Sequence, residues 1–337
     1  MRVGFNPNKD KRQKKNDFFH QIIVPVYIPN HEGYFRDSFK ILKYCLESLF
    51  KTSHNKTYFT IVNNGSCQEV VDYLEELRKE NKIHEVVHTT AIGKLNAILK
   101  GLVGHKFDLI TITDADVLFL NNWQKATYEV FDAFKKAGAV GSTPSSKVLK
   151  QYTSNVIIEN IFSSDLKFTK VLNPDAMKKF ANSIGNANFY NDNHLKKNLT
   201  ISSQNIRAII GAGHFVATYR GQIFEHLKTK YTSYSLGGDS ETYILDQPVE
   251  EKGYWRLTTE ANYTYHMGNV FEEWMNDFYV LLVQEADEIN VPINSAYKPK
   301  TYFDRFTKSL FKIMIKKTFW KLFLRYKGLT KKEAQNY

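Results

Sequence analysis

The sequence predicts an α/β fold in which a mostly parallel, Rossmann-like sheet is flanked by helices on both faces, and three observations support this. From Gln21 onward, short apolar runs alternate with longer amphipathic stretches, as in parallel strands joined by crossover helices. Polar turns follow several of the apolar runs, where the strands of such a sheet end. The 337 residues are 42% hydrophobic and 14% aromatic, which is enough to build a large core.

The first half of the chain alternates most clearly between the two kinds of element. Residue composition and periodicity predict strands at 21–27, 58–64, 84–90, 107–113 and 139–143. Apolar residues at helical spacing predict helices between them, at 35–51, 69–81, 94–102 and 123–138.

The second half is less regular. Residues 145–204 are rich in Asn, Lys and Ser and are predicted to form an insertion of short helices and loops. Residues 206–227 predict a glycine-punctuated strand or loop that leads into a helix. We expect four segments, listed here: a basic N-terminal segment at 1–19, a regular half at 20–142, a less regular half at 143–275, and a basic helical extension at 276–337.

Composition excludes several classes of protein. Two cysteines, Cys45 and Cys67, are too few for a disulfide framework or a CxxC zinc site. Residues 1–19 are polar and basic, without the apolar core of a signal peptide, and no apolar run reaches the length of about 18 residues that a membrane span requires. These features predict a cytoplasmic protein. The net charge of +11 predicts an acidic partner.

The stretch "FDLITITDADVLFL" places two carboxylates, Asp114 and Asp116, at the end of a buried-type strand. Side chains two residues apart on a strand point the same way, so the two acids are expected to converge. Magnesium and manganese favour one or two carboxylates together with phosphate oxygens, so the pair predicts metal chemistry on a phosphorylated substrate. The alternative is that Asp114 caps a turn and Asp116 is solvated.

Two other polar turns follow predicted strands. "IVNNGS" puts Asn63 and Asn64 where such a sheet receives a base or a ribose, and an amide can pair with the edge of a uracil or a guanine. "GKLNA" puts Lys94 and Asn96 at a helix start, which favours a phosphate or a ribose hydroxyl. Either stretch alone is also compatible with a plain turn or a solvated lysine.

From about residue 20 to residue 269 the sequence resembles the nucleotide-sugar-dependent glycosyltransferases of the GT-A fold, specifically family 2, many of which build bacterial polysaccharides. The motifs that carry the resemblance occur in the order of that family; they are "IIVPVYIPN", "CLESLF", "TIVNNGS", "GKLNAILKG", "TITDADVLFL", "GAGHFVATYRG", "LGGDSE" and "YHMGN". The chain differs from many members at Asn63 and Asn64, where they carry two aspartates, and at "GGDSE", where Glu-Asp-x-Asp is common.

The resemblance implies that residues 20–142 form a nucleotide-sugar-binding half and residues 143–275 an acceptor-binding and catalytic half. It also implies roles for individual residues. The nucleotide sugar would be bound by Pro25, Tyr27, Asn63, Asn64, Gly93, Lys94, Asn96, Thr113, Asp114 and Ala115. Asp116, with Asp114, would hold Mn²⁺ or Mg²⁺. His266 matches a late histidine that many of these enzymes bring to the metal, although a lone histidine is also compatible with a purely structural role.

The same resemblance assigns the chemistry on the acceptor side. Asp239 in "GGDSE" matches the general base and Glu241 a supporting acid; without the resemblance, this stretch is compatible with a loop and an N-capped helix. Gly213 and His214 would line the acceptor side together with Arg220, although Arg220 is also compatible with pairing to a surface acid. An acceptor hydroxyl activated by Asp239 would displace the nucleotide from the opposite face of the sugar and invert the anomeric carbon.

The C-terminal segment carries much of the charge. Residues 303–337 hold ten Lys or Arg against two acids, and cations alternate with aromatic or aliphatic side chains. The apolar face changes sides after Lys317, which predicts a break at 316–318 between two short amphipathic helices. Residues 303–327 are compatible with peripheral contact to the inner face of a membrane and, equally, with packing on the catalytic domain. No nucleic-acid motif accompanies the charge, so no nucleic-acid partner is expected.

The sequence therefore predicts an inverting, metal-dependent glycosyltransferase that moves a sugar, with UDP favoured as the nucleotide, onto a glycan or lipid-linked acceptor. Two alternatives remain at this point: a sugar nucleotidyltransferase, whose Gly-rich N-terminal loop is absent from "VPVYIPN", and a glycan-binding protein of the same fold without activity.

Overall fold

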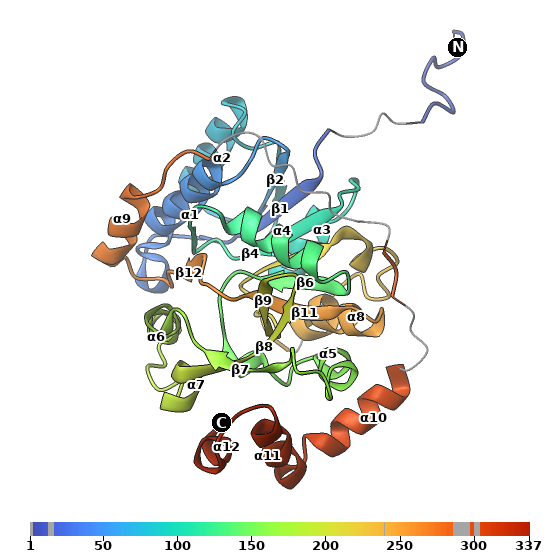
Figure 1. Ribbon diagram of the computed structural model, residues 1–337. Helices are drawn as coiled ribbons and strands as arrows, with labels where there is room; N and C mark the ends of the chain where they lie inside the picture. Colours follow the sequence, from blue (N-terminus) through green and yellow to red (C-terminus); the bar gives the residue numbers. More distant parts are fainter. Residues whose placement is uncertain (1–2, 13–16, 239, 286–296, 300–303) are drawn as a thin grey trace.

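The computed structural model describes residues 3–12, 17–238, 240–285, 297–299 and 304–337. Figure 1 shows helices on both sides of a central sheet, with the last three helices grouped at the end of the molecule where β7 lies.

Ten strands form the main sheet. In order across the sheet they are β3 (Glu85–Thr89), β2 (Thr57–Asn64), β1 (His20–Val26), β4 (Leu109–Thr113), β10 (Val216–Arg220), β6 (Ala137–Gly141), β11 (Trp255–Thr259), β9 (Ile206–Ile210), β8 (Lys197–Ser203) and β7 (Lys167–Lys170). The first four are parallel to one another, whereas β10, β9 and β7 run opposite to the rest. The predicted sheet is thus confirmed, and β10 inserts between β4 and β6, so both halves of the chain share it.

Twelve α-helices surround the two sheets in the part of the chain that the structure describes. They are α1 (Ser38–Thr52), α2 (Gln68–Lys79), α3 (Lys94–Gly101), α4 (Trp123–Ala133), α5 (Ser154–Glu159), α6 (Pro174–Ser183), α7 (Asp192–Lys196), α8 (Gln247–Glu251), α9 (Glu273–Val280), α10 (Asp304–Met314), α11 (Lys317–Tyr326) and α12 (Lys331–Asn336).

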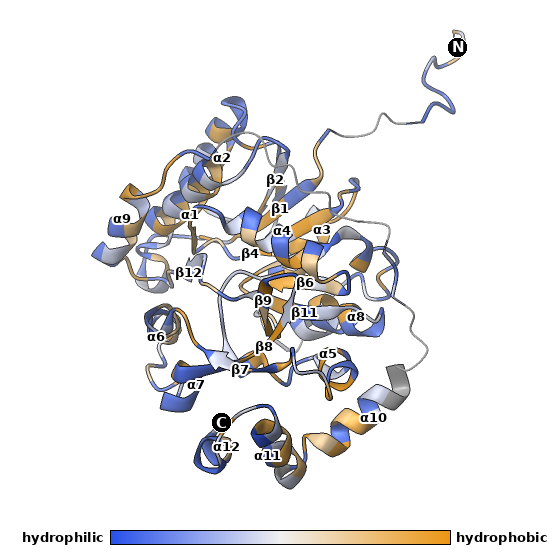
Figure 2. Ribbon diagram, in the orientation of Figure 1, coloured by the Kyte–Doolittle hydropathy of each residue, from blue (hydrophilic) through white to orange (hydrophobic). Residues whose placement is uncertain are grey.

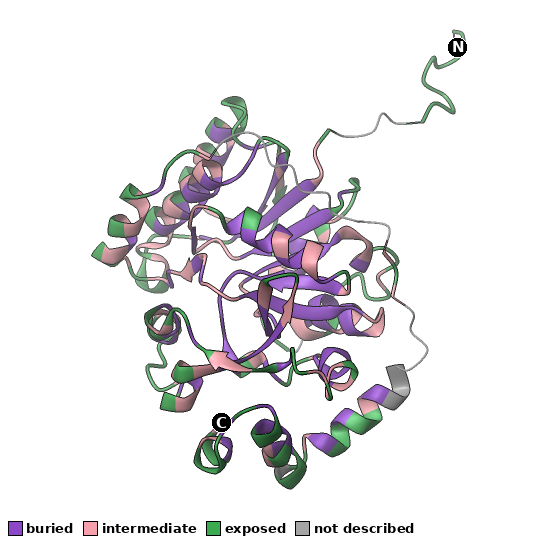
Figure 3. Ribbon diagram, viewed as in Figure 1, coloured by how far each residue is buried: buried purple, intermediate pink, exposed green. Residues whose placement is uncertain are grey.

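The alternation of side chains along β1 explains why helices cover both faces. Ile22 and Val24 pack with the apolar residues of α1 and α2, whereas Ile23, between them, packs with those of α3. A strand that is apolar on both faces must be covered twice, which is why its sequence is a continuous apolar run. Figures 2 and 3 show this apolar interior and its burial in the central strands.

Two predictions for the second half of the chain were wrong. Residues 145–204 contain strands β7 and β8 as well as short helices, because Asn198 and Thr200, which made this stretch look polar, are buried on β8. Residues 206–227 form strands β9 and β10 and end in a single 3₁₀ turn at Gly221–Ile223 rather than in a helix.

A separate two-stranded ribbon lies at the carboxyl end of β4. It pairs β5 (Val117–Phe119) with β12 (Thr264–His266), and the register sets His266 opposite Val117. The main-chain N–H of Met267 also donates to the carbonyl of Asp116 at 2.8 Å. The ribbon therefore joins a residue of the first half to one more than a hundred positions later.

The C-terminal helices pack on the rest of the protein. Phe311 and Met314 of α10 and Trp320 and Phe323 of α11 are buried in the same core cluster as Leu109 of β4. The two helices meet at residues 315–316, so the predicted break is confirmed. Among the described residues, no helix is long and apolar enough to cross a membrane.

Candidate active site

A cavity of about 750 Å³ opens beyond the carboxyl ends of β1, β2 and β4. Cavities of this size suit a ligand larger than a single sugar. Its lining includes nine of the residues expected from the sequence: Pro25, Tyr27, Asn64, Gly93, Lys94, Asp114, Ala115, Asp116 and His266. The strand ends therefore converge on one pocket, as a parallel sheet requires.

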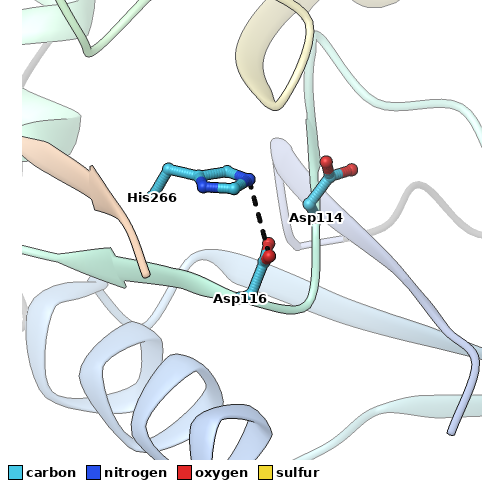
Figure 4. Close-up of side chains that lie close together, drawn as sticks. All are labelled: Asp114, Asp116 and His266. Atoms are coloured by element: carbon cyan, nitrogen blue, oxygen red, sulfur yellow. Dashed lines mark ion pairs between the residues drawn. The ribbon is translucent and has the colours of Figure 1, made fainter. Parts of the chain in front are cut away.

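Three side chains that could ligate a metal ion meet in this pocket (Figure 4). One ligand atom each from Asp114, Asp116 and His266 lie within 4.8 Å of one another. The Nε2 atom of His266 is 3.5 Å from Oδ2 of Asp116. The other carboxylate oxygen of Asp116, Oδ1, is buried and has no hydrogen-bond partner among the described residues. Oxygen and imidazole donors with one buried oxygen unpartnered fit a divalent cation.

The hydrogen bonds of Ser183 fix the orientation of His266. The hydroxyl of Ser183 lies 2.8 Å from Nδ1 of His266 and 2.8 Å from the carbonyl oxygen of Phe180. A serine has one proton to donate and the carbonyl can only accept, so the hydroxyl donates to Phe180. Nδ1 of His266 must then be the donor to Ser183, which leaves the lone pair of Nε2 directed toward Asp116.

Lys94 is the one cation of this acidic cluster in the described part of the chain. Its Nζ lies 2.7 Å from Asp114 and 2.7 Å from Glu241. Burial disfavours the ammonium, but the charges of Asp114 and Glu241 outweigh burial and raise the pKa of Lys94. One ammonium thus faces three carboxylates, including that of Asp116, and the excess negative charge favours a further cation.

The pKa of the Asp116 carboxyl reflects this excess of negative charge. Burial raises its pKa, and the charge of Asp114 adds to the increase; Lys94 and, when it is protonated, His266 oppose it. The carboxylate is the form that binds metal, so an ion with two positive charges would reverse the increase.

The two asparagines that end β2 have different surroundings. Asn63 is buried, and its amide is 2.9 Å from Nδ1 of His88 while its oxygen accepts from the N–H of Ser66 at 3.0 Å. It is absent from the pocket lining. Asn64 lines the pocket, and its oxygen accepts from the N–H of Ile92 at 2.8 Å, which ties the end of β2 to the start of α3.

The start of α3 is covered by a distant segment. The main-chain N–H of Lys94 donates to the carbonyl of Ser235 at 3.0 Å. Asn96 donates to the carbonyl of Thr232 and accepts from its N–H. Asn96 therefore holds this segment in place and does not line the pocket. The main-chain N–H of Lys94 is therefore bonded within the protein and is not free to bind a phosphate.

The acceptor-side residues lie apart from the pocket lining. Nδ1 of His214 is 3.2 Å from Asp246, a buried carboxylate that also pairs with the buried Arg256 at 2.7 Å. Burial raises the pKa of Glu241, but Lys94 and His214 lower it below its usual value. Asp239 lies outside the described residues.

Arg220 corrects one expectation. Its side chain is 1% exposed, and its Nε donates to the carbonyl of Ala137 at 2.7 Å, with further bonds to the carbonyls of Phe131 and Lys135. It links β10 to the end of α4 and is not an acceptor contact. Thr113 is likewise buried in β4 and Gly213 lies in the β9–β10 loop; neither lines the pocket.

Sequence reasoning missed two residues of the site. Tyr34 lines the pocket from the 3₁₀ turn Gly33–Phe35, and its pKa is raised by burial and by the charges of Asp116 and Asp114. An exposed aromatic residue just after the first strand was a usable signal. Ser183 had none, because its importance comes from the packing of α6 against β12.

A family model described as "Glycosyl transferase family 2" matches residues 22–190. This span holds the two aspartates and the strand ends that form the pocket. The chain belongs to this family. It is accordingly a glycosyltransferase of the GT-A fold, as the sequence predicted. No curated protein matches the sequence significantly.

Solved structures with a similar chain trace have low sequence identity to this protein. TarS 1-349 from S. aureus is 14% identical, with 92% of this glycosyltransferase and 81% of that chain covered and a TM-score of 0.45. The same protein in complex with UDP-GlcNAc is 15% identical, with 80% and 68% covered and a TM-score of 0.42. The mannosyltransferase PcManGT from Pyrobaculum calidifontis, in complex with GDP-Man and Mn²⁺, is 12% identical, with 91% and 72% covered and a TM-score of 0.45.

Proposed function

We propose that this glycosyltransferase is metal-dependent and inverting, and that it moves a sugar from a nucleotide diphosphate, UDP favoured, to a hydroxyl of a glycan or lipid-linked acceptor. The observation that carries the proposal is the convergence of Asp114, Asp116 and His266 on one large pocket, with Lys94 as their described cationic neighbour.

Asp114, Asp116 and Nε2 of His266 would hold Mn²⁺ or Mg²⁺. The ion would supply positive charge against which the pyrophosphate leaves. The unpartnered Oδ1 of Asp116 and the lone pair on Nε2 of His266 support this assignment, since neither atom has a hydrogen-bond partner among the described residues.

The remaining residues of the pocket would bind the nucleotide sugar. Tyr27 and Asn64 lie at the ends of the first two strands, where they can contact a base or ribose. Tyr34 would donate a hydrogen bond from its hydroxyl to an anionic part of the donor. A phenol is protonated at neutral pH, and burial and the charges of Asp116 and Asp114 raise the pKa of Tyr34 further. Lys94 would contribute charge next to the diphosphate.

Asp239 is proposed as the general base on the strength of the family resemblance, with Glu241 as its acidic neighbour. Glu241 is ionised and held by Lys94, so it is better placed to position Lys94 than to accept a proton itself. A base on the face opposite the leaving nucleotide would give a single displacement and inversion of the anomeric carbon.

Two variants test the assignment. Asp116→Ala is expected to lose Mn²⁺-dependent binding of UDP, measured by calorimetry, while Asp239→Asn is expected to keep that binding and lose transfer by about 10²-fold or more. The anomeric configuration of the transferred sugar in the product, measured by NMR, checks inversion. Normal transfer by Asp239→Asn would contradict the base assignment, and metal-independent binding in the wild type would contradict the metal site.

We also propose that the enzyme works in the cytoplasm, at the inner face of the membrane, where lipid-linked acceptors of polysaccharide synthesis are exposed. The basic, partly apolar helices α10 and α11 support this location.

A further inference from the structure

A cationic groove lies between α11 and α12. It encloses about 260 Å³, and Lys321 and Arg325 of α11 and Lys331 of α12 contribute its charge. None of these three cations forms an ion pair or a hydrogen bond with another described residue. Their charge is therefore available to an external anion.

The protein's own acid does not neutralise this groove. Residues 317–332 contain no acid at all. Glu333, which follows them, is 3.0 Å from Lys197 and accepts from the N–H of Thr330 at 2.7 Å. These bonds anchor α12 on the rest of the protein, so they fix one wall of the groove and use the carboxylate elsewhere.

An apolar stripe runs beside the cations on α11. Phe319, Leu322 and Tyr326 are 54%, 52% and 62% exposed, and their spacing of three and four residues puts them on one side of the helix. The side that packs on the protein is a different one, formed by Trp320, Phe323 and Leu324 (all buried). Figure 3 shows these buried and exposed sides of α11.

The preceding helix, α10, also exposes apolar side chains. Leu310 and Ile313 of α10 are 37% and 47% exposed, although Phe311 and Met314 beside them are buried. Both helices thus bury one set of apolar side chains in the core and leave another set exposed to solvent. Exposed apolar area costs about 25 cal/mol per Å² relative to burial, which favours an apolar environment for the stripe.

We propose that the groove and the stripe together form a binding site for the phosphate headgroups of an anionic bilayer, hereafter the α11–α12 surface. Lys321, Arg325 and Lys331 would bind headgroup phosphates, and Phe319, Leu322 and Tyr326 would enter the region between headgroups and acyl chains. A soluble phosphate would use the cations and leave the stripe in water, whereas a bilayer satisfies both. The inference deepens the proposed membrane contact and rests on that part of the proposed function, not on the catalytic assignment.

Vesicle sedimentation of the full chain tests the α11–α12 surface. The wild type is expected to bind vesicles of phosphatidylglycerol and phosphatidylcholine, and to bind phosphatidylcholine alone much more weakly. The double variant Lys321→Gln/Arg325→Gln should lower the partition coefficient about 30-fold, since each cation near an anionic surface contributes about 1 kcal/mol. Leu322→Ser should lower it as well, without any change in charge.

A matched control removes the same charge elsewhere. Lys79 on α2 and Lys125 on α4 are exposed and form no ion pair among the described residues, so Lys79→Gln/Lys125→Gln should change the partition coefficient less than 3-fold, an effect of net charge alone. Equal losses in the two double variants would overturn the proposal, because they would mean that net charge alone drives binding.

Three further results would overturn it. One is equal binding to neutral and anionic vesicles. Another is displacement from vesicles by millimolar glycerol phosphate, which would indicate a site for a soluble phosphate. The third is tight binding of single-stranded RNA without vesicle binding. Transfer to a soluble acceptor is measured in parallel: its persistence in Lys321→Gln/Arg325→Gln separates failure of the α11–α12 surface from failure of the proposed function.

Discussion

The contact between Ser183 and His266 gives the sharpest test of the site. Ser183→Ala removes the acceptor for Nδ1–H of His266, and with it the bond that fixes both the tautomer and the ring orientation. The imidazole can then rotate or carry its proton on Nε2, where it no longer ligates. Loss of such a supporting bond costs about 10- to 100-fold in metal affinity, or roughly 1.4 to 2.7 kcal/mol.

The assay is a titration of Mn²⁺ in the presence of saturating UDP, followed by calorimetry or by the electron-spin signal of free Mn²⁺. Ser183→Thr keeps the hydroxyl and should retain the affinity. Thr127→Ala serves as a control. It removes another hydroxyl that donates to a helical carbonyl, that of Trp123 at 2.7 Å, and it lies on α4, which contributes no residue to the pocket lining. An affinity in Ser183→Ala equal to that of the wild type would refute the reasoning that His266 is a ligand oriented by Ser183.

Three other predictions concern stability and the donor pocket. Lys94→Met leaves two carboxylates without their ammonium. We expect the free energy of unfolding to fall by about 2 kcal/mol, a small loss for such pairs because the site is partly exposed. Added Mn²⁺ should restore part of the thermal midpoint. Burial lowers the pKa of His54 from 6.5 to about 4. The contribution of the neutral imidazole to stability is therefore complete above pH 6.5 and is lost as pH falls toward 4. Urea unfolding should show the free energy of unfolding falling by about 3 kcal/mol over this range, and His54→Gln should remove this pH dependence. Gly93 has a φ of +90°, and an added Cβ would lie 3.0 Å from Cα of Ser235, so Gly93→Ala should weaken UDP binding measured by calorimetry.

Two of the three proposed metal ligands, Asp114 and Asp116, could be predicted because each leaves a local sign in the sequence. Asp114 and Asp116 end an apolar strand, where carboxylates are out of place unless they have a role. His266 needed the family resemblance, since one histidine in a strand carries no information by itself. Its partnership with Asp116 depends on the pairing of β5 with β12, which joins residues about 150 positions apart.

The residues that were misassigned depend on contacts that sequence alone does not contain. Asn96 looked like a ligand at a helix start, but a segment 136 residues later takes its hydrogen bonds. Arg220 ends the buried strand β10, and its burial depends on carbonyls of β6 and of the end of α4. Strand β8 was missed because its buried Thr200 bonds to β7 and so behaves as a core residue. In each case the partner lies far away along the chain.

The antiparallel pairing of β5 with β12 has a consequence for how the cluster is preserved. Asp116 directly precedes the strand whose Val117 faces His266, so the spacing between the two side chains is set by ladder hydrogen bonds and not by loop conformation. A single residue inserted between Thr259 and Thr264 would either lengthen the turn or shift the register of β12 against β5. A shift by one residue would turn the imidazole of His266 to the other face of the ribbon. Insertions here should therefore be far less tolerated than insertions of equal length in the exposed turns of residues 160–165.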